Sequence, residues 1–144
     1  MIGFGEAIAL FYKNYVNFSG RASRAEYWWS ALYQLIVYGA LVIGFFIWVG
    51  IDNFSSPETD FAIGLLFILG ALFWLVNFLP GIAIQVRRFH DLDQTGWLVL
   101  VFMIANAIIT VTFFVQLIWF AMRGTEGSNK YGPNPYWREA DIFG

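Results

Sequence analysis

The sequence predicts an all-α membrane protein, with an amphipathic N-terminal helix followed by a bundle of three long apolar helical segments. Of the 144 residues, 59% are hydrophobic and 12% are charged, and this charged fraction is about half that of a soluble domain. Three runs contain no Asp, Glu, Lys or Arg, and each can cross a hydrocarbon core of about 30 Å as a helix. These runs are 27–51, 61–86 and 97–122. We therefore expect one integral membrane domain, 1–144.

Residues 2–18 have the pattern of an amphipathic helix. Large apolar residues recur at spacings of four and three, which places them on one helical face. The segment is too polar to span a membrane. It lies either in the membrane interface or against the protein's own helices, which would give the same pattern. The apolar face consists of Phe4, Ile8, Phe11, Tyr15 and Phe18.

A helix-start signal precedes the first apolar run. Ser23 and Glu26 have the spacing of a capping box, in which the serine accepts the Glu26 amide and the glutamate reaches back. We therefore expect a helix to begin at Ser23 and to continue through 27–51. The stretch 52–60 then reads as a short acidic loop that contains Pro57 and no Lys or Arg.

The second and third runs carry a proline and several uncharged polar residues. Pro80 removes the hydrogen bond to the carbonyl of Val76, which predicts a kink in 61–86. In 97–122, four polar residues fall within about half of the helix circumference, so we expect them to face the bundle. They are Asn106, Thr110, Thr112 and Gln116.

The distribution of basic residues predicts the topology, because Lys and Arg favour the cytoplasmic side of short loops. Three precede the first run and two follow the second, whereas 52–60 has none, so the N-terminus is expected inside. The tail 123–144 holds three more. Either 97–122 crosses once and carries this tail outside, or it returns as a re-entrant hairpin that turns near Asn106. Arms of about 12 residues, roughly 18 Å, would be too short to cross.

The stretch 87–97 is a charged island between two apolar runs and holds the sole histidine. We interpret it as a loop at the membrane surface. Under the predicted topology it faces the same interface as 20–26, so that arginines can engage carboxylates bidentately. The predicted polar cluster consists of Arg21, Arg24, Glu26, Arg87, Arg88, His90 and Asp91.

Two readings of this cluster stay open. In the first, it is a polar cytoplasmic clasp that docks helix ends, and the protein is a non-enzymatic scaffold or partner-binding protein. In the second, it is a basic pocket for an anionic lipid headgroup or a small phosphate-bearing ligand, with transport by an oligomer as an extension. The tail has a structural role in both, with a helix C-cap at its start. Its motif is Gly124, Asn129, Tyr131, Gly132 and Pro135.

The pair His90-Asp91 raises catalytic readings, of which a membrane enzyme acting on a lipid headgroup is the most concrete. Metal-dependent His-Asp hydrolases and three-His zinc sites need further histidines, and there is no cysteine for a thiolate site. A triad through Ser19 or Ser23 lacks a nucleophile elbow. The Asp-Leu-Asp sequence at 91–93 has no accompanying nucleotide-binding domain. We therefore assign no catalytic residue, metal ligand or cofactor, although His90 could sense pH.

The composition also limits the kinds of partner that we expect. The spans contain no ionisable group, so an ion pathway within one protomer is not expected, and only an oligomeric pore stays open. Nucleic-acid binding is not expected, because the eight basic residues lie beside membrane spans. The expected partners are the lipid bilayer, an anionic lipid, and a second copy or another membrane protein.

Three motifs together resemble a known family. They are Phe18–Trp28, Arg87–Asp91 with Thr95–Trp97, and Gly124–Pro135. They are similar to the small bacterial inner-membrane proteins of the YhaH type, catalogued as domain of unknown function 805, and the resemblance covers nearly the whole chain. It implies a multi-pass protein of the bacterial cytoplasmic membrane and brings no established activity. The family's Pro-Gly break in the last apolar segment is absent here, where the chain reads Met103-Ile104-Ala105-Asn106-Ala107.

Overall fold

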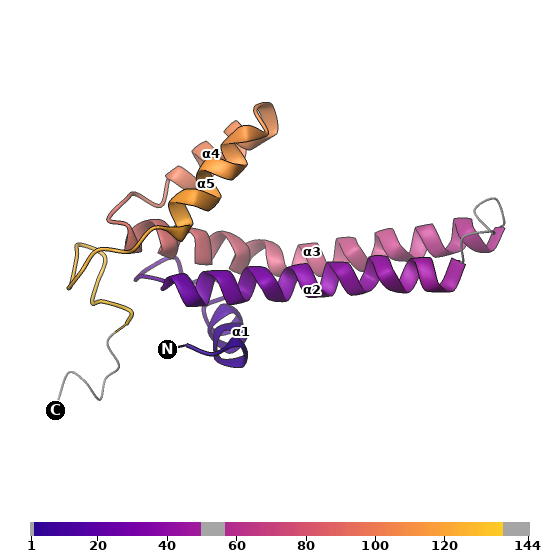
Figure 1. Ribbon diagram of the computed structural model, residues 1–144, viewed down its shortest axis with the longest axis horizontal. Coiled ribbons are helices and arrows are strands. Elements are labelled where there is room, and N and C mark those ends of the chain that lie inside the picture. Colours follow the sequence, from indigo (N-terminus) through magenta and orange to yellow (C-terminus); the bar gives the residue numbers. More distant parts are fainter. Residues whose placement is uncertain (1, 50–56, 137–144) are drawn as a thin grey trace. The chain divides into compact units, whose positions relative to one another are not determined.

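The computed structural model describes residues 2–49 and 57–136, and these residues fold into five helices without a β-strand (Figure 1). The predicted all-α class is confirmed. Two compact units are present, one from the described parts of 1–30 and 79–144, and one from Ala31–Phe78. Parts of the predicted loop 52–60 and of the tail lie outside the described residues. The helices are α1 (Phe4–Lys13), α2 (Arg24–Val49), α3 (Pro57–Asp91), α4 (Leu98–Ile108) and α5 (Val111–Ala121).

Helix α1 is shorter than the predicted 2–18. Asn14 is its C-cap, and both the backbone N–H and the side-chain amide of Asn14 donate to the carbonyl of Leu10, at 3.0 Å and 2.9 Å. The side chains of Ala7 and Phe11, one turn apart, are fully buried, and Phe11 belongs to a small core with Ala22 and Ile84. Of the predicted apolar face, Phe11 therefore packs on the protein itself, whereas Phe4 and Phe18 are 37% and 40% exposed.

Helix α2 begins as the sequence predicts, although only half of the capping box forms. The hydroxyl of Ser23 accepts the backbone N–H of Glu26 at 3.1 Å, and the first helical residue is Arg24. The carboxylate of Glu26 accepts instead from Arg87, at 2.8 Å. The glutamate thus ties α2 to α3, where a capping box would have used it locally.

Helix α3 extends beyond the predicted run 61–86 at both ends. Its 35 residues correspond to about 52 Å, which exceeds a hydrocarbon core of about 30 Å. Pro57, predicted in a loop, is the first helical residue, where proline's missing N–H costs nothing. The interpretation of 87–97 as a loop is wrong for its first half, since the helix ends only at Asp91. The chain stays helical through Pro80, and the kink stays a prediction.

The third apolar run forms two short helices that lie side by side in Figure 1. Helices α4 and α5 have 11 residues each. The break is at Ile109, whose backbone is extended (φ −131°, ψ 99°), three residues beyond the predicted turn at Asn106. The five residues Ile108–Thr112 are all β-branched, and such residues are weak helix formers. This β-branched stretch explains why the helix breaks at Ile109 although no proline or glycine is present there.

Polar side chains link the hairpin to α3. Gln116 donates to the side-chain oxygen of Gln85 at 3.0 Å, and Asn106 donates to that of Gln116 at 3.1 Å. The hydroxyl of Thr112 lies 2.5 Å from the side-chain oxygen of Asn106. These three predicted polar residues do face other helices. Thr110, the fourth, is instead the residue before α5 and is exposed.

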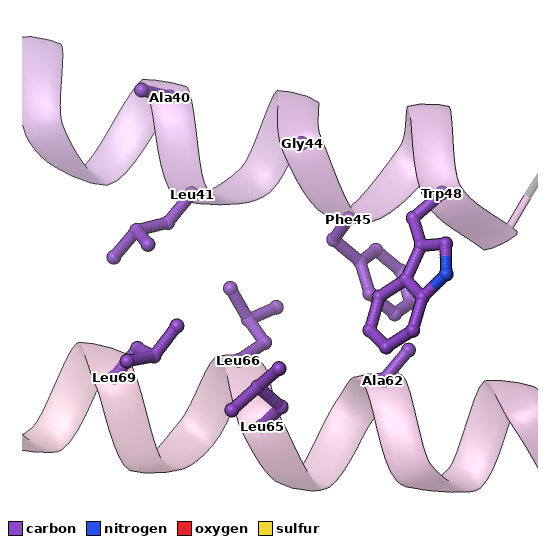
Figure 2. A pocket seen from close by; sticks show the side chains of 9 residues that line it. All are labelled: Ala40, Leu41, Gly44, Phe45, Trp48, Ala62, Leu65, Leu66 and Leu69. Atoms are coloured by element: carbon purple, nitrogen blue, oxygen red, sulfur yellow. The ribbon is translucent and has the colours of Figure 1, made fainter.

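The unit Ala31–Phe78 is apolar and presents large side chains outward, among them Leu35 at 68% and Phe67 at 73% exposure. A cavity of about 190 Å³ lies in this unit. Figure 2 shows Leu41, Phe45 and Trp48 pointing from α2 toward α3. Only apolar side chains and a glycine line it. Helices α2 and α3 are long and apolar enough to cross a membrane. Exposed apolar surface of this extent is typical of a lipid-facing helix.

Candidate functional site: a buried arginine–aspartate clasp

Asp91, the last residue of α3, sits between two arginines. Its Oδ1 accepts from Nε of Arg21 at 3.0 Å and lies 2.9 Å from Nη2 of the same arginine, and its Oδ2 accepts from Nη1 of Arg88. Arg88 and Asp91 are fully buried, and Arg21 is 8% exposed. Charges buried to this degree are tolerated only when they are paired and their remaining hydrogen bonds are made. We call Arg21, Arg88 and Asp91 the clasp.

The other N–H groups of the two arginines bind backbone carbonyls of the chain's C-terminal part. Arg88 donates through Nε to the carbonyl of Phe120 at 3.1 Å and through Nη2 to that of Met122. Arg21 donates to the carbonyls of Thr125 and Gly127, both at 2.6 Å. The last carbonyls of a helix carry partial negative charge and lack partners within the helix. Arg88 supplies these partners at the end of α5, whereas Arg21 binds carbonyls of the tail outside the helix. The clasp thus joins the segment before α2, the end of α3 and the residues after α5.

Arg87 forms a separate ion pair with Glu26, and both residues are 4% exposed. Its Nη1 donates to Glu26 at 2.8 Å, whereas its buried Nε and Nη2 have no acceptor among the described residues. The carbonyl of Arg87 accepts the N–H of Ala22 at 3.0 Å. Arg87 therefore docks the start of α2 on α3 through a single side-chain hydrogen bond and leaves two donors unsatisfied.

His90 docks the tail. Its Nδ1 lies 3.1 Å from the carbonyl of Gly20, so the neutral ring donates from Nδ1. The ring of Tyr131 stacks on it at 3.8 Å and 5°, and Asn129 donates to its backbone carbonyl at 2.8 Å. His90 lies beyond the apolar run 61–86, and burial lowers the pKa of His90 below its ordinary value of 6.5. The ring is thus neutral at pH 7 and packs as an aromatic.

The residues of the tail motif allow its backbone to pack closely on Asp91 and to form tight turns. Gly124 lies against Asp91, because a Cβ at residue 124 would overlap the carboxylate. The prediction that Gly124 caps α5 is wrong, since Met122 takes that position with an extended backbone. Gly132 has a φ of 137° and exchanges two backbone hydrogen bonds with Asn129, each at 3.0 Å. Pro135 lies in the following turn.

Arg24 is the member of the predicted cluster that the structure separates from it. Its Nη1 reaches only the carbonyl of Ala121, at 3.5 Å, and its side chain lines a different cavity together with Arg123. Sequence reasoning did not find Arg123 as a site residue. It also missed the carbonyls that the clasp binds, because a backbone acceptor has no side-chain signature.

Comparisons with known proteins agree with this architecture. The family model described as "Protein of unknown function (DUF805)" matches residues 15–133. The chain is 37% identical over 123 residues to the inner membrane protein YhaI of Escherichia coli strain K12, covering 85% of this chain and 89% of that protein. It is 33% identical over 123 residues to the inner membrane protein YhaH of the same strain, covering 85% and 90%. No solved structure matches the chain. The chain therefore belongs to the DUF805 family of membrane proteins, whose function is unknown.

Proposed function

We propose that the protein is a non-enzymatic scaffold of the bacterial inner membrane, whose cytoplasmic face is held together by the clasp. The observation that carries this proposal is the saturation of Asp91 and Arg88, which are fully buried and spend their polar atoms on joining distant segments. Such a rigid face suits the docking of a second copy or of another membrane protein. Relatives named inner membrane proteins support the location.

The same geometry argues for structure over catalysis. A general acid or base must lie within hydrogen-bond reach of a substrate proton. Asp91 has no exposed surface, and Glu26 is 4% exposed and engaged by Arg87. The Nδ1 of His90 faces the carbonyl of Gly20, and Gly96 lies beside the ring, since a Cβ added at residue 96 would lie 3.0 Å from Nε2. Asp91, Glu26 and the Nδ1 of His90 are thus occupied by structural contacts.

We further propose that α2 and α3 span the membrane and that α4 and α5 form a re-entrant hairpin. Eleven residues correspond to about 16 Å, too short to cross. The hairpin tip is apolar and exposed, with Ile108 at 75% and Val111 at 62%. Part of its backbone is satisfied internally, since Ile109 donates to Ala105 at 2.7 Å and Thr112 to Ile109 at 3.0 Å, and a break inside a membrane needs such bonds. All eight basic residues then lie on the cytoplasmic side.

Single-cysteine labelling tests this topology, because the chain has no cysteine of its own. We expect a membrane-impermeant maleimide to label Ser55→Cys in intact spheroplasts, and Ser19→Cys and Ser128→Cys only after the membrane is opened. Ile109→Cys should stay unlabelled in both preparations. Labelling of Ser128→Cys from outside would contradict the hairpin and support a single crossing.

Paired substitutions test the scaffold role. Asp91→Asn should lower abundance in the membrane and the unfolding temperature together, since it leaves two arginines facing a neutral amide. Asp93→Asn is the matched control, because Asp93 is exposed and its one ion pair, with Lys130, is long at 3.6 Å among the described residues. Its φ of 58° also suits asparagine. If Asp91→Asn stayed folded and abundant but lost a cellular phenotype, the scaffold proposal would be wrong and Asp91 would belong to a reactive site.

The partner is tested by crosslinking from position 128 in intact membranes, combined with light scattering of the purified protein. A crosslinked species that disappears in Asp91→Asn but persists in Asp93→Asn supports a partner docked on the clasp face. A monomer without any crosslinked species would contradict the scaffold.

A further inference from the structure

A cavity of about 230 Å³ lies between the start of α2, the residues after α5 and the tail. Arg24 and Arg123 line it, together with Asn134 and Tyr136. Neither arginine belongs to the clasp, and neither forms an ion pair within the part of the chain that the structure describes. The cavity is smaller than the roughly 300–1,000 Å³ of sites for drug-sized ligands. Its size and its two unpaired guanidinium groups suit a small anion.

The remaining lining groups add hydrogen-bond donors. The phenolic oxygen of Tyr136 accepts the backbone N–H of Arg24 at 3.1 Å, so its own proton remains available to a ligand. The side-chain oxygen of Asn134 accepts the N–H of Tyr136 at 3.0 Å, which leaves the amide nitrogen as a donor. Glu126 also lines the cavity, so one carboxylate opposes two guanidinium groups. The lining therefore keeps a net positive charge, and its two arginines can each bind a phosphate bidentately.

The cavity lies at the level expected for lipid headgroups. Arg24 precedes the apolar run at Tyr27 by three residues, about 4.5 Å along a helix. Trp28 and Trp29, which are 39% and 37% exposed, are of the type that marks a membrane interface. The cavity also adjoins the N-terminus of α2, whose helix dipole favours negative charge.

We propose that the cavity lined by Arg24 and Arg123 binds a phosphate group, carried either by the headgroup of an anionic phospholipid or by a soluble phosphate compound. This proposal goes beyond the scaffold role, because the clasp forms without either arginine. The two proposals also fail separately, since loss of phosphate binding leaves the clasp contacts in place.

The test uses the full chain in mild detergent, with Arg123→Gln as the variant. Arg123 is exposed and lies outside the clasp, so the variant should fold with the unfolding temperature of the parent protein. Lys13→Gln is the matched control, since it removes the same charge from the exposed end of α1. Native mass spectrometry measures retained phosphatidylglycerol, and calorimetry measures binding of inorganic phosphate.

We expect Arg123→Gln to lower the affinity for the probe that binds roughly tenfold, as the loss of a hydrogen bond between charged groups would. Lys13→Gln should leave this affinity unchanged. Arginine-dependent retention of phosphatidylglycerol supports the proposal with a lipid as the source. Arginine-dependent binding of inorganic phosphate, without retained lipid, supports it with a soluble source. If neither probe binds, or if both bind equally well to Arg123→Gln, the proposal is overturned. Tyr136→Phe, which removes one donor without changing charge, should show a smaller loss in the same assay.

Discussion

Gly124 lies so close to Asp91 that a carbon atom added at residue 124 would overlap the aspartate carboxylate. The backbone of the tail thus packs directly on the group that joins two arginines. Thr125, the next residue, donates its backbone N–H to the carbonyl of Asp91 at 2.8 Å. The tail is held by contacts with both the side chain and the backbone of the same residue.

Gly124→Ala should therefore destabilise the protein strongly, by about 3 kcal/mol or more, because the added methyl group must displace a buried, paired carboxylate. Thermal unfolding in detergent, followed by circular dichroism, measures the effect. Gly81→Ala in α3 is the control, since a Cβ there meets nothing within 4 Å. It should be stabilising by roughly 0.5–1 kcal/mol, as expected for a helical glycine. Equal unfolding temperatures for the two variants would refute the close approach.

Replacement of the two adjacent arginines by lysine should have very different effects. Arg88 uses three nitrogens, toward Phe120, Asp91 and Met122, so Arg88→Lys loses at least two buried contacts and should cost about 3–5 kcal/mol. Within the described residues, Arg87 makes one side-chain hydrogen bond and leaves two buried nitrogens without an acceptor. Arg87→Lys keeps the pair with Glu26 and reduces the number of unsatisfied N–H groups, so the free energy of unfolding should change by less than about 1 kcal/mol. The prediction fails if Arg87→Lys is the more damaging change.

Acidification should destabilise the protein through His90. Burial lowers the pKa of His90 in the folded state below its ordinary 6.5, so the unfolded chain binds the proton more readily. The resulting penalty is absent well above pH 6.5 and grows as the pH falls through 6.5 toward the folded pKa. Unfolding temperatures measured from about pH 8 to pH 5.5 should show this loss. Because His90 is the only histidine, His90→Gln should remove this loss of stability, and an unchanged loss would assign it to other groups.

The hydrogen bond between Gln85 and Gln116, at 3.0 Å, should couple α3 to the hairpin. A double-mutant cycle with leucine at both positions should give a coupling of about 0.6 kcal/mol, the average for interhelical hydrogen bonds in membranes. Gln116→Leu alone should be the most damaging variant, since it also deprives Asn106 of its acceptor. Strict additivity would show that the amides do not interact.

The apolar runs were sufficient to predict the helices, but not where α3 ends. The charges at 87–91 suggested a loop, yet Phe89 is fully buried in a core with Phe102 and Phe120. This aromatic continues the helical spacing from Val86, three residues earlier. Burial of one residue in the island, a tertiary effect, thus decides the helix boundary.

The pairing of arginines with carboxylates near the N-terminal segment was predictable from their spacing and topology, but the choice of partners was not. Arg87 and Arg88 are neighbours in sequence, yet they point to Glu26 and Asp91 respectively. Adjacent residues on a helix diverge by about 100°, and only the placement of other segments decides what each one meets. The break at Ile109 had a signal in its β-branched neighbours, which a search for proline or glycine overlooks.

The carbonyls that the clasp binds belong to residues translated well after the arginines themselves. While the ribosome is still making the third apolar run, Arg21 and Arg88 have no acceptors at 120–127 and must keep their hydration. Closure of the clasp therefore has to wait for residues 120–127. A chain interrupted before residue 120 would keep both guanidinium groups without these carbonyl acceptors, a feature by which an unfinished copy differs physically from a finished one.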